Sequence, residues 1–411
     1  MVLTVKGIGK IQDSKIEMKG ITVIAGENNT GKSTFGKALY CMFNAFCNAE
    51  DKIYETQSND IKRVFQSGLP RFRNYFLRQS TINNILSGHD IQEAINEVIR
   101  VYTPSNPEID DNVIDALSEN LKKLISIDKH EIQRTMVTRC FRQEFSGKMN
   151  HINKPDTEGI VSLEIRKKIV EVKIKSDECI LFNDKVGILH DAIYIDTPFI
   201  MDDVNNFFSE EFTGFYYMPK HRDDLLDLLI KYKPDSAVLE EIIIKQKISN
   251  LLLKINSVVN GEFRETDNNL MYAEQGLHKP IPLKNVSAGI KVFLIIKRLL
   301  ELGEIKERDI LIFDEKEIHL HPDWQLRFAE ILVLLQNEFN LTILLTTHSP
   351  YFLHAIEVYS SKHGVSERLK CYLAESEGDT SGVKDVTENI DDIYKQLAAP
   401  FQKLEDDLYA G

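Results

Sequence analysis

One octapeptide constrains this chain more than any other feature. Residues 26–33 read Gly-Glu-Asn-Asn-Thr-Gly-Lys-Ser and fit the pattern G-x-x-x-x-G-K-[ST]. An apolar run typical of a buried strand precedes them at 21–25, and an apolar face at helical spacing follows them at 35–46. A strand, a glycine-bearing loop and a helix in this order predict a loop whose backbone N–H groups wrap a phosphate.

The chemistry of a nucleotide gives each part of this loop a role. Glycines permit positive φ angles and a close approach of the backbone. Lys32 is expected to reach the β- and γ-phosphates of ATP, and Ser33 to bind Mg²⁺. The residues expected to contact the nucleotide are Gly26, Glu27, Asn28, Asn29, Thr30, Gly31, Lys32, Ser33 and Thr34. A chance Gly-Lys-Ser turn is the alternative, with odds of about one in a hundred before the context is counted.

A second apolar run supplies the acidic residues that a phosphate loop requires. Residues 310–313 are Ile-Leu-Ile-Phe, and Asp314 and Glu315 follow them. Asp314 is expected to hold Mg²⁺ directly or through water, and Glu315 to polarise the attacking water. An acidic pair is common at any strand end, so the assignment depends on the phosphate loop that comes first in the chain.

Two further segments carry polar residues next to apolar runs. His348 ends the run 342–347 and is predicted to contact the γ-phosphate, although most histidines at strand ends have no such role. Ser287 precedes the apolar helix expected over 290–302 and is a natural N-cap. The functional alternative is that Ser287, Gly289 and the helix dipole bind a γ-phosphate.

Composition and charge limit the cellular setting. The 411 residues allow two or three domains, or one domain with a large insertion. No apolar run approaches the roughly 18 residues of a membrane helix, and no signal peptide is visible. The cysteines form no C-x-x-C pair. We therefore expect a reduced, cytoplasmic protein without membrane contact. The net charge of −13 opposes uniform coating of nucleic acid. Residues 51–185 carry 21 basic and 21 acidic side chains, so they are the better candidate for contact with a polyanion.

Hydrophobic periodicity predicts an α/β fold, a mostly parallel sheet flanked by helices, with an inserted helical module. The residues before the phosphate loop read as two short strands, and 159–197 as further strands. The expected parts are an N-terminal lobe at 1–50 and 146–200, a helical module at 51–145, a helical segment at 201–259, a C-terminal lobe at 260–385 and a polar amphipathic helix at 386–411.

Four motifs together resemble those of ABC/SMC-type P-loop ATPases. They are the phosphate loop, Ser287-Ala288-Gly289, the stretch from Asp314 to Pro322 and Thr346-Thr347-His348-Ser349-Pro350. Within that class the chain is most similar to the OLD-like (overcoming-lysogenization-defect) branch of prokaryotic AAA ATPases, which includes ATPase subunits of antiphage systems such as Septu. The similarity covers residues 1–50 and about 186–400 and is poor between them.

The resemblance implies an ATP-binding and ATP-hydrolysing homodimer, or a higher homo-oligomer, with composite sites. One subunit would supply the phosphate loop, Asp314, Glu315 and His348, and its mate Ser287 and Gly289. It also implies a separate effector protein, a nuclease or toxin. The signature is shorter than that of transporters, which favours slow turnover, and Lys316 replaces the proline usual in the family. The glutamine loop of the family has no assigned counterpart.

Other readings remain open at this point. A DNA-clamping SMC-like repair ATPase is the main alternative, because residues 71–78 interleave basic and aromatic side chains as a single-strand binder does. A nucleotide-binding scaffold with little turnover is another. Glu171 and Lys173 have the E-x-K spacing of some nucleases, and His151 and Asn153 resemble an H-N site, but both patterns are short and expected by chance. His319 and His321 suggest a metal pair, but no third ligand of suitable spacing is apparent, and a helix start after Pro322 explains them better.

Overall fold

The computed structural model describes residues 1–69, 77–88, 91–102, 110–205, 218–231, 248–266 and 269–409. The chain divides into two compact units. The larger unit consists of Met1–Cys47 and Thr138–Gly411, and the smaller unit of Asn48–Val137.

Strands occur only in the larger unit, as far as the described ranges go. They are β1 (Val2–Ile8), β2 (Ile11–Glu17), β3 (Ile21–Gly26), β4 (Gly159–Ile165), β5 (Lys168–Lys175), β6 (Glu178–Asp184), β7 (Ala192–Ile195), β8 (Gly261–Thr266), β9 (Asn269–Glu274), β10 (Ile281–Pro282), β11 (Ile310–Asp314), β12 (Thr342–Thr347), β13 (Leu369–Glu377) and β14 (Thr380–Asp385).

The helices of the larger unit are α1 (Lys32–Asn44), α7 (Ile200–Asp203), α8 (Lys220–Ile230), α10 (Ala288–Leu302), α11 (Pro322–Phe339), α12 (Pro350–Lys362) and α13 (Asp391–Tyr409), with a further helical stretch at 248–256. The helices that lie in or reach the smaller unit are α2 (Ala49–Gly68), α3 (Gln79–Leu86), α4 (Ile91–Tyr102), α5 (Asp111–Ile125) and α6 (Lys129–Glu144).

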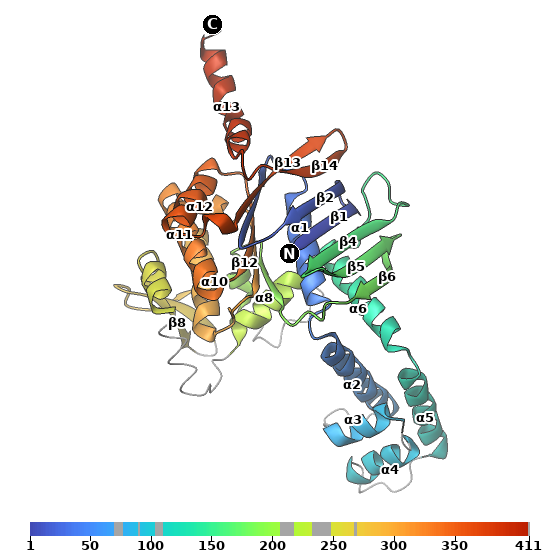
Figure 1. The fold of residues 1–411 in the computed structure, drawn as a ribbon. Coiled ribbons are helices and arrows are strands. Elements are labelled where there is room, and N and C mark those ends of the chain that lie inside the picture. Colours follow the sequence, from blue (N-terminus) through green and yellow to red (C-terminus); the bar gives the residue numbers. More distant parts are fainter. Residues whose placement is uncertain are drawn as a thin grey trace. The chain divides into compact units, whose positions relative to one another are not determined.

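Eleven of the described strands form one sheet in the order β6-β5-β4-β1-β2-β14-β13-β3-β12-β11-β7 (Figure 1). The five strands from β13 to β7 are parallel, and β3 lies inside this group with every residue buried. The strands from β6 to β2 are antiparallel. Burial on both faces explains why the parallel strands are mostly apolar in sequence. The α/β fold expected from the sequence is confirmed, with an antiparallel extension added to its parallel core.

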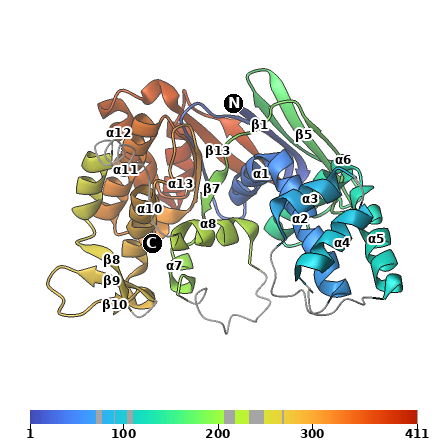
Figure 2. The ribbon, with the colours of Figure 1, turned by 90° about the horizontal axis from the view of Figure 1, so that it is seen from below.

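Helices cover both faces of the parallel strands. Figure 2 shows α10, α11 and α12 together on one side and α1 on the other. Val23, Leu311 and Leu345 belong to the core that includes α10, α11 and α12. On the other face α1 approaches closely, because a Cβ on Gly36 would lie 3.2 Å from Ile312 Cγ2. This two-sided burial fixes the carboxyl ends of the strands, where the polar motif residues are placed.

The described part of the smaller unit is helical and has its own apolar core. The buried side chains that form it are Ile61, Phe65, Leu69, Leu77, Ile82, Ile85, Ile91, Ala94, Ile95, Val98, Leu117 and Leu121. The division into functional parts inferred from the sequence stays a prediction. Residues 71–76, most of the basic and aromatic stretch considered for DNA contact, lie outside the described residues.

The structure contains more strands than the sequence indicated. Residues 2–8 form β1, which pairs with both β2 and β4, so three strands precede the phosphate loop instead of two. A hairpin of β13 and β14 follows residue 368, and β8, β9 and β10 form a separate three-stranded sheet. The residues of β8 are mostly exposed, so no hydrophobic alternation marks them.

Two properties bear on the setting inferred from composition. The five cysteines form no disulfide bond. In the part of the chain that the structure describes, no helix has the length and apolar character needed to span a membrane.

Candidate nucleotide-binding site

The loop between β3 and α1 requires glycine at two positions. Gly26 has φ 154°, and a Cβ there would lie 2.5 Å from the carbonyl oxygen of Ala374 on β13. Gly31 has φ 81°, and its Cβ would lie 2.7 Å from Ile11 Cδ1. Any other residue would therefore be strained and would also clash. The two glycines bring the loop back across the end of β3 and start α1 at Lys32.

Lys32 lies inside the loop rather than in solvent. Its side chain is 3% exposed. The ammonium donates to the carbonyl oxygens of Gly26 at 3.0 Å and Glu27 at 2.7 Å, and it lies 3.2 Å from Glu315 Oε1. Lys32 thus connects the phosphate loop to the acidic end of β11. In the sequence these two segments are far apart and are related only through their motifs.

A cavity of about 450 Å³ opens over this loop. Its lining residues are Gly9, Lys10, Asn28, Asn29, Gly31, Lys32, Ser33, Thr34, Ile152 and Glu315. Two lysines and the N-terminal end of α1 outnumber the one carboxylate in the lining, that of Glu315, so the cavity has a net positive character that suits a polyphosphate.

Three lining residues were missed in the sequence. Gly9 and Lys10 form the turn between β1 and β2, and Lys10 Nζ donates to the carbonyl of Asn29 at 3.4 Å. Ile152 N donates to Gly9 O at 2.9 Å, which holds the 150–154 loop beside this turn. No local motif marks these positions, because they meet only when β1, β2 and the loop after α6 come together.

Asp314 ends β11 and has both carboxylate oxygens occupied. Oδ1 accepts a hydrogen bond from the Thr346 hydroxyl, and Oδ2 accepts one from the Tyr194 hydroxyl at 2.9 Å. Burial and the neighbouring carboxylates raise the pKa of Tyr194 well above its usual value, so this hydroxyl stays protonated and remains a donor. Asp314, Thr346 and Tyr194 lie close together because β12 and β7 pair with β11 on its two sides, parallel and in register.

Glu315 turns out of the strand toward the cavity. It has φ 51°, and its N–H bonds to Thr346 O at 3.2 Å and Thr346 Oγ1 at 3.1 Å. Its Oε1 lies 3.8 Å from His348 Nδ1, besides its contact with Lys32. The structure therefore brings together Lys32, Glu315 and His348 around one carboxylate oxygen.

The segment after Glu315 is packed inside the protein. Glu317 is 1% exposed and accepts hydrogen bonds from the Thr347 hydroxyl and from His348 N, the latter at 3.3 Å. Burial raises the pKa of Glu317. Lys316, which stands where the resemblance leads one to expect proline, is also 1% exposed, and burial lowers its pKa to about 8. A proline could not supply this buried amine.

Ser287 and Gly289 lie apart from the phosphate-loop cavity of their own chain, whose lining contains neither. Ser287 is the exposed N-cap of α10, and its Oγ accepts from Ile290 N at 3.4 Å. Gly289 is buried, and a Cβ there would lie 3.0 Å from His319 O and 3.1 Å from the Trp324 ring. Glycine is therefore required where α10 passes the loop before α11.

We expect Ser287→Ala to lower the free energy of unfolding by about 1 kcal/mol, because the change removes one N-cap hydrogen bond. Chemical denaturation measures this directly. Ser349 is a positive control in which a larger loss is expected, since its Oγ caps α12 by accepting from Phe352 N at 3.2 Å and also donates to Gln325 Oε1 at 2.9 Å. A loss from Ser349→Ala with none from Ser287→Ala would show that the cap on α10 contributes nothing.

The short nuclease-like and metal-like patterns have local structural roles. Lys173 Nζ pairs with Glu158 at 3.2 Å. His151 is buried, and its Nδ1 accepts from Asn153 N at 3.2 Å. His321 caps α11, as a helix starting at Pro322 requires, and the ring of His319 contacts that of Phe199 edge-on at 5.6 Å.

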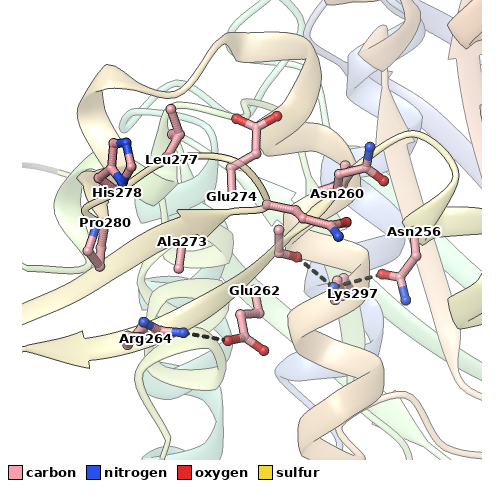
Figure 3. Close-up of a pocket in the computed structure, with 13 residues that line it drawn as sticks. Asn256, Asn260, Glu262, Arg264, Ala273, Glu274, Leu277, His278, Pro280 and Lys297 are labelled. Carbon is pink, nitrogen blue, oxygen red and sulfur yellow. Dashed lines mark hydrogen bonds and ion pairs between the residues drawn. The ribbon is translucent and has the colours of Figure 1, made fainter.

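A second cavity, of about 420 Å³, lies between the small sheet and α10 (Figure 3). It shares no lining residue with the phosphate-loop cavity. Lys297 from α10 donates to Asn256 Oδ1 at 2.8 Å and to the Gly261 carbonyl at 2.7 Å, and Arg264 pairs with Glu262 at 3.0 Å. Lys297 therefore ties the small sheet to α10.

Known proteins resemble this chain at three levels. A family model described as AAA ATPase domain matches residues 1–353. A protein of Vibrio cholerae serotype O1 biovar El Tor, named "Retron Vc95 probable ATPase", is 23% identical over 390 residues, which cover 82% of this chain and 67% of that protein.

Solved structures of SMC heads are also similar. An SMC head domain from Thermotoga maritima is 13% identical with a TM-score of 0.39, over 94% of this chain and 98% of that one. An Smc head domain with an extended coiled coil, bound to the C-terminal domain of ScpA from Pyrococcus furiosus, is 12% identical with a TM-score of 0.43, over 96% and 98%. The family match spans most of the residues described above, including the phosphate loop, β11 and β12. The chain belongs to the AAA ATPase domain family.

Proposed function

We propose that this protein is an ATP-binding and ATP-hydrolysing switch that closes as a homodimer around nucleotide and thereby regulates a partner effector, a nuclease or toxin, in antiphage defence. The observation that carries the proposal is the cluster of Lys32, Glu315 and His348 beside the phosphate-loop cavity. A merely structural loop would not need a buried lysine and a carboxylate that line one cavity, with an imidazole 3.8 Å from that carboxylate.

The residues around the cavity fit ATP with Mg²⁺. The loop N–H groups and Lys32 would bind the β- and γ-phosphates, in the positive field of α1. Mg²⁺ takes oxygen ligands, commonly one or two carboxylates with phosphates and waters. Ser33 lines the cavity and would supply a hydroxyl, and Asp314, which directly precedes the lining residue Glu315, would supply a carboxylate. The metal would neutralise charge that develops on the phosphates. Glu315 would orient the attacking water, and His348 would contact the γ-phosphate from beside Glu315.

A second copy of the chain is the partner that best completes the site. Ser287 is exposed and lies outside the cavity of its own chain. Phe199 and Ile318 are 49% and 52% exposed, and Phe199 contacts His319, beside Gly289. Exposed apolar side chains next to an exposed helix N-terminus support a surface that another subunit covers when its own loop holds ATP.

The assignment to defence rests on similarity rather than on the site. The relative is named as the probable ATPase of a retron, which supports a role as one component of a larger system. The motif set also favours the OLD-like branch, with Septu-like ATPase subunits, and the composition favours a cytoplasmic location. We propose slow turnover, consistent with a switch, because the signature segment is short.

Mixing two inactive variants tests the composite site. Ser287→Arg should leave the subunit folded and able to bind ATP, because Ser287 is exposed, but the bulky side chain should prevent closure on the mate's nucleotide. Lys32→Ala should remove nucleotide binding from its own loop. A mixed dimer holds one site in which both residues are intact, so ATP hydrolysis in the mixture should exceed that of either variant alone.

Wild-type protein mixed with each variant is the control, since it shows whether one intact site suffices for turnover. Recovery in the variant mixture supports the shared site. If that mixture stays inactive while the wild-type mixtures retain turnover, Ser287 does not act across subunits.

A further inference from the structure

A buried tyrosine lies directly behind the carboxylate at the end of β11. Tyr194 is 1% exposed, and its hydroxyl donates to Asp314 Oδ2 at 2.9 Å. Space for the ring comes from α1, where a Cβ on Gly36 would lie 3.2 Å from the tyrosine hydroxyl oxygen. With the Thr346 hydroxyl on Oδ1, both oxygens of Asp314 are held by donors from neighbouring strands. The carboxylate therefore cannot rotate without breaking two hydrogen bonds.

The tyrosine ring is itself held by His221 from α8. The two rings are stacked, with centroids 4.2 Å apart and an interplanar angle of 24°. His221 Nδ1 lies 2.7 Å from Glu144 Oε1, and Nε2 lies 3.1 Å from Asp196 Oδ1. Arg222 Nε donates to both oxygens of Asp196 at 2.9 Å. A carboxylate at each ring nitrogen fixes the imidazole plane against the tyrosine.

The pKa values of His221 and Asp196 reflect the charged side chains that surround them in this cluster. Burial lowers the pKa of His221, but the carboxylates of Asp196 and Glu144 beside its two ring nitrogens outweigh burial, and the net shift is upward. Burial likewise opposes ionisation of Asp196, while His221 and Arg222 bring its pKa well below the usual value. His221 and Arg222 thus face two carboxylates, and Glu144 is fully buried, so leaving that carboxylate without a partner would be costly.

We propose that Tyr194 is a positioning residue for the metal site, which fixes the Asp314 carboxylate in the orientation that Mg²⁺ requires, and that the stacked His221 holds Tyr194 in place. The inference rests on the proposed ATPase function. It assigns a task to a residue that touches neither nucleotide nor metal. Glu144 is the last residue of α6, so the cluster also connects the end of that helix to Asp314.

The rival explanation is that the cluster only stabilises the fold. Metal dependence separates the two explanations, because a structural role predicts lower stability with no specific change in metal affinity. Outer-shell partners of metal ligands typically contribute about 10- to 100-fold to metal affinity. Tyr194→Phe keeps the stacked ring and removes only the hydroxyl, so the variant is expected to fold.

Tyr40 offers a matched control. It is fully buried in the same cluster, its ring contacts those of Tyr194 and His221, and its hydroxyl donates to Asp224 instead of Asp314. Tyr40→Phe therefore removes a buried hydroxyl–carboxylate hydrogen bond without touching the metal carboxylate.

The experiment measures ATP affinity of full-length wild type and both variants by calorimetry, in EDTA and in a Mg²⁺ series, together with their melting temperatures. For Tyr194→Phe we expect unchanged affinity in EDTA and about a tenfold higher Mg²⁺ concentration for half-maximal enhancement of ATP binding and for half-maximal turnover. Tyr40→Phe should show the wild-type Mg²⁺ dependence. Equal Mg²⁺ dependence in wild type and Tyr194→Phe, or equal shifts in both variants, would overturn the inference.

Two further results complete the test. His221→Gln should raise the Mg²⁺ requirement in the same direction, because the amide cannot stack on Tyr194 as the imidazole does. A folded His221→Gln protein with the wild-type Mg²⁺ dependence would remove His221 from the proposal. If the wild-type protein shows no Mg²⁺-dependent ATP binding, the proposed function fails and the inference with it. If only Tyr194→Phe behaves like wild type, the inference alone fails.

Discussion

Replacing Lys32 with alanine is expected to lower ATP affinity at least a hundredfold while leaving the protein folded. The ammonium has three N–H donors, which now meet two loop carbonyls and Glu315. A nucleotide would draw them to its β- and γ-phosphates. Hydrogen bonds to charged groups contribute about 1.5–3 kcal/mol each, so losing two corresponds to roughly a hundredfold or more in affinity. Calorimetric titration with ATP measures this loss.

Lys10→Ala is the control for charge alone. Lys10 lines the same cavity but is only partly buried and contacts the loop through a single 3.4 Å hydrogen bond. We expect less than a tenfold loss there. Millimolar or tighter ATP binding by a folded Lys32→Ala protein would remove the assignment of residues 26–33 as a phosphate loop.

Changing Glu315 to glutamine is expected to slow hydrolysis at least a hundredfold while ATP still binds. The amide keeps the shape of the side chain but cannot accept a proton from water, and general-base catalysis typically contributes about 10²- to 10⁴-fold. Phosphate release under single-turnover conditions measures the rate. The ATP-bound dimer should accumulate, which size-exclusion chromatography with ATP and Mg²⁺ can detect.

A nearby carboxylate provides the comparison for this variant. Asp323, in the first turn of α11, has a side chain that is 81% exposed and lies outside the cavity lining. Asp323→Asn should leave turnover within about twofold. Unchanged hydrolysis by Glu315→Gln would mean that another group orients the water.

Each part of the site that could be predicted is encoded by a few consecutive residues. The phosphate loop, the apolar run before Asp314 and the N-cap before α10 are local patterns with a local physical cause. Hydrophobic periodicity gave the α/β class for the same reason. Buried parallel strands are mostly apolar, whatever their order in the sheet.

The parts that were missed depend on contacts between distant segments. Tyr194, His221 and Glu144 come from β7, α8 and α6, and no spacing rule connects them. Tyr194 belongs to an apolar run that reads only as a strand. Likewise, β1 carries buried apolar residues, but its sequence does not show that the strand lies between β2 and β4. Sequence periodicity reports burial, but it does not report which strand becomes the neighbour.

The position of β3 in the sheet has a consequence for how the protein is made. Residues 21–26 pair with residues 343–347 on one side and with 369–374 on the other, and Gly26 packs against Ala374. During synthesis the N-terminal segment leaves the ribosome long before either partner exists. Pairing across such separations is slow, and an unpaired apolar strand invites association with other chains. The nascent chain therefore cannot complete its nucleotide pocket until β13 has been synthesised. We expect its dependence on chaperones to be greatest between the synthesis of β3 and that of β13.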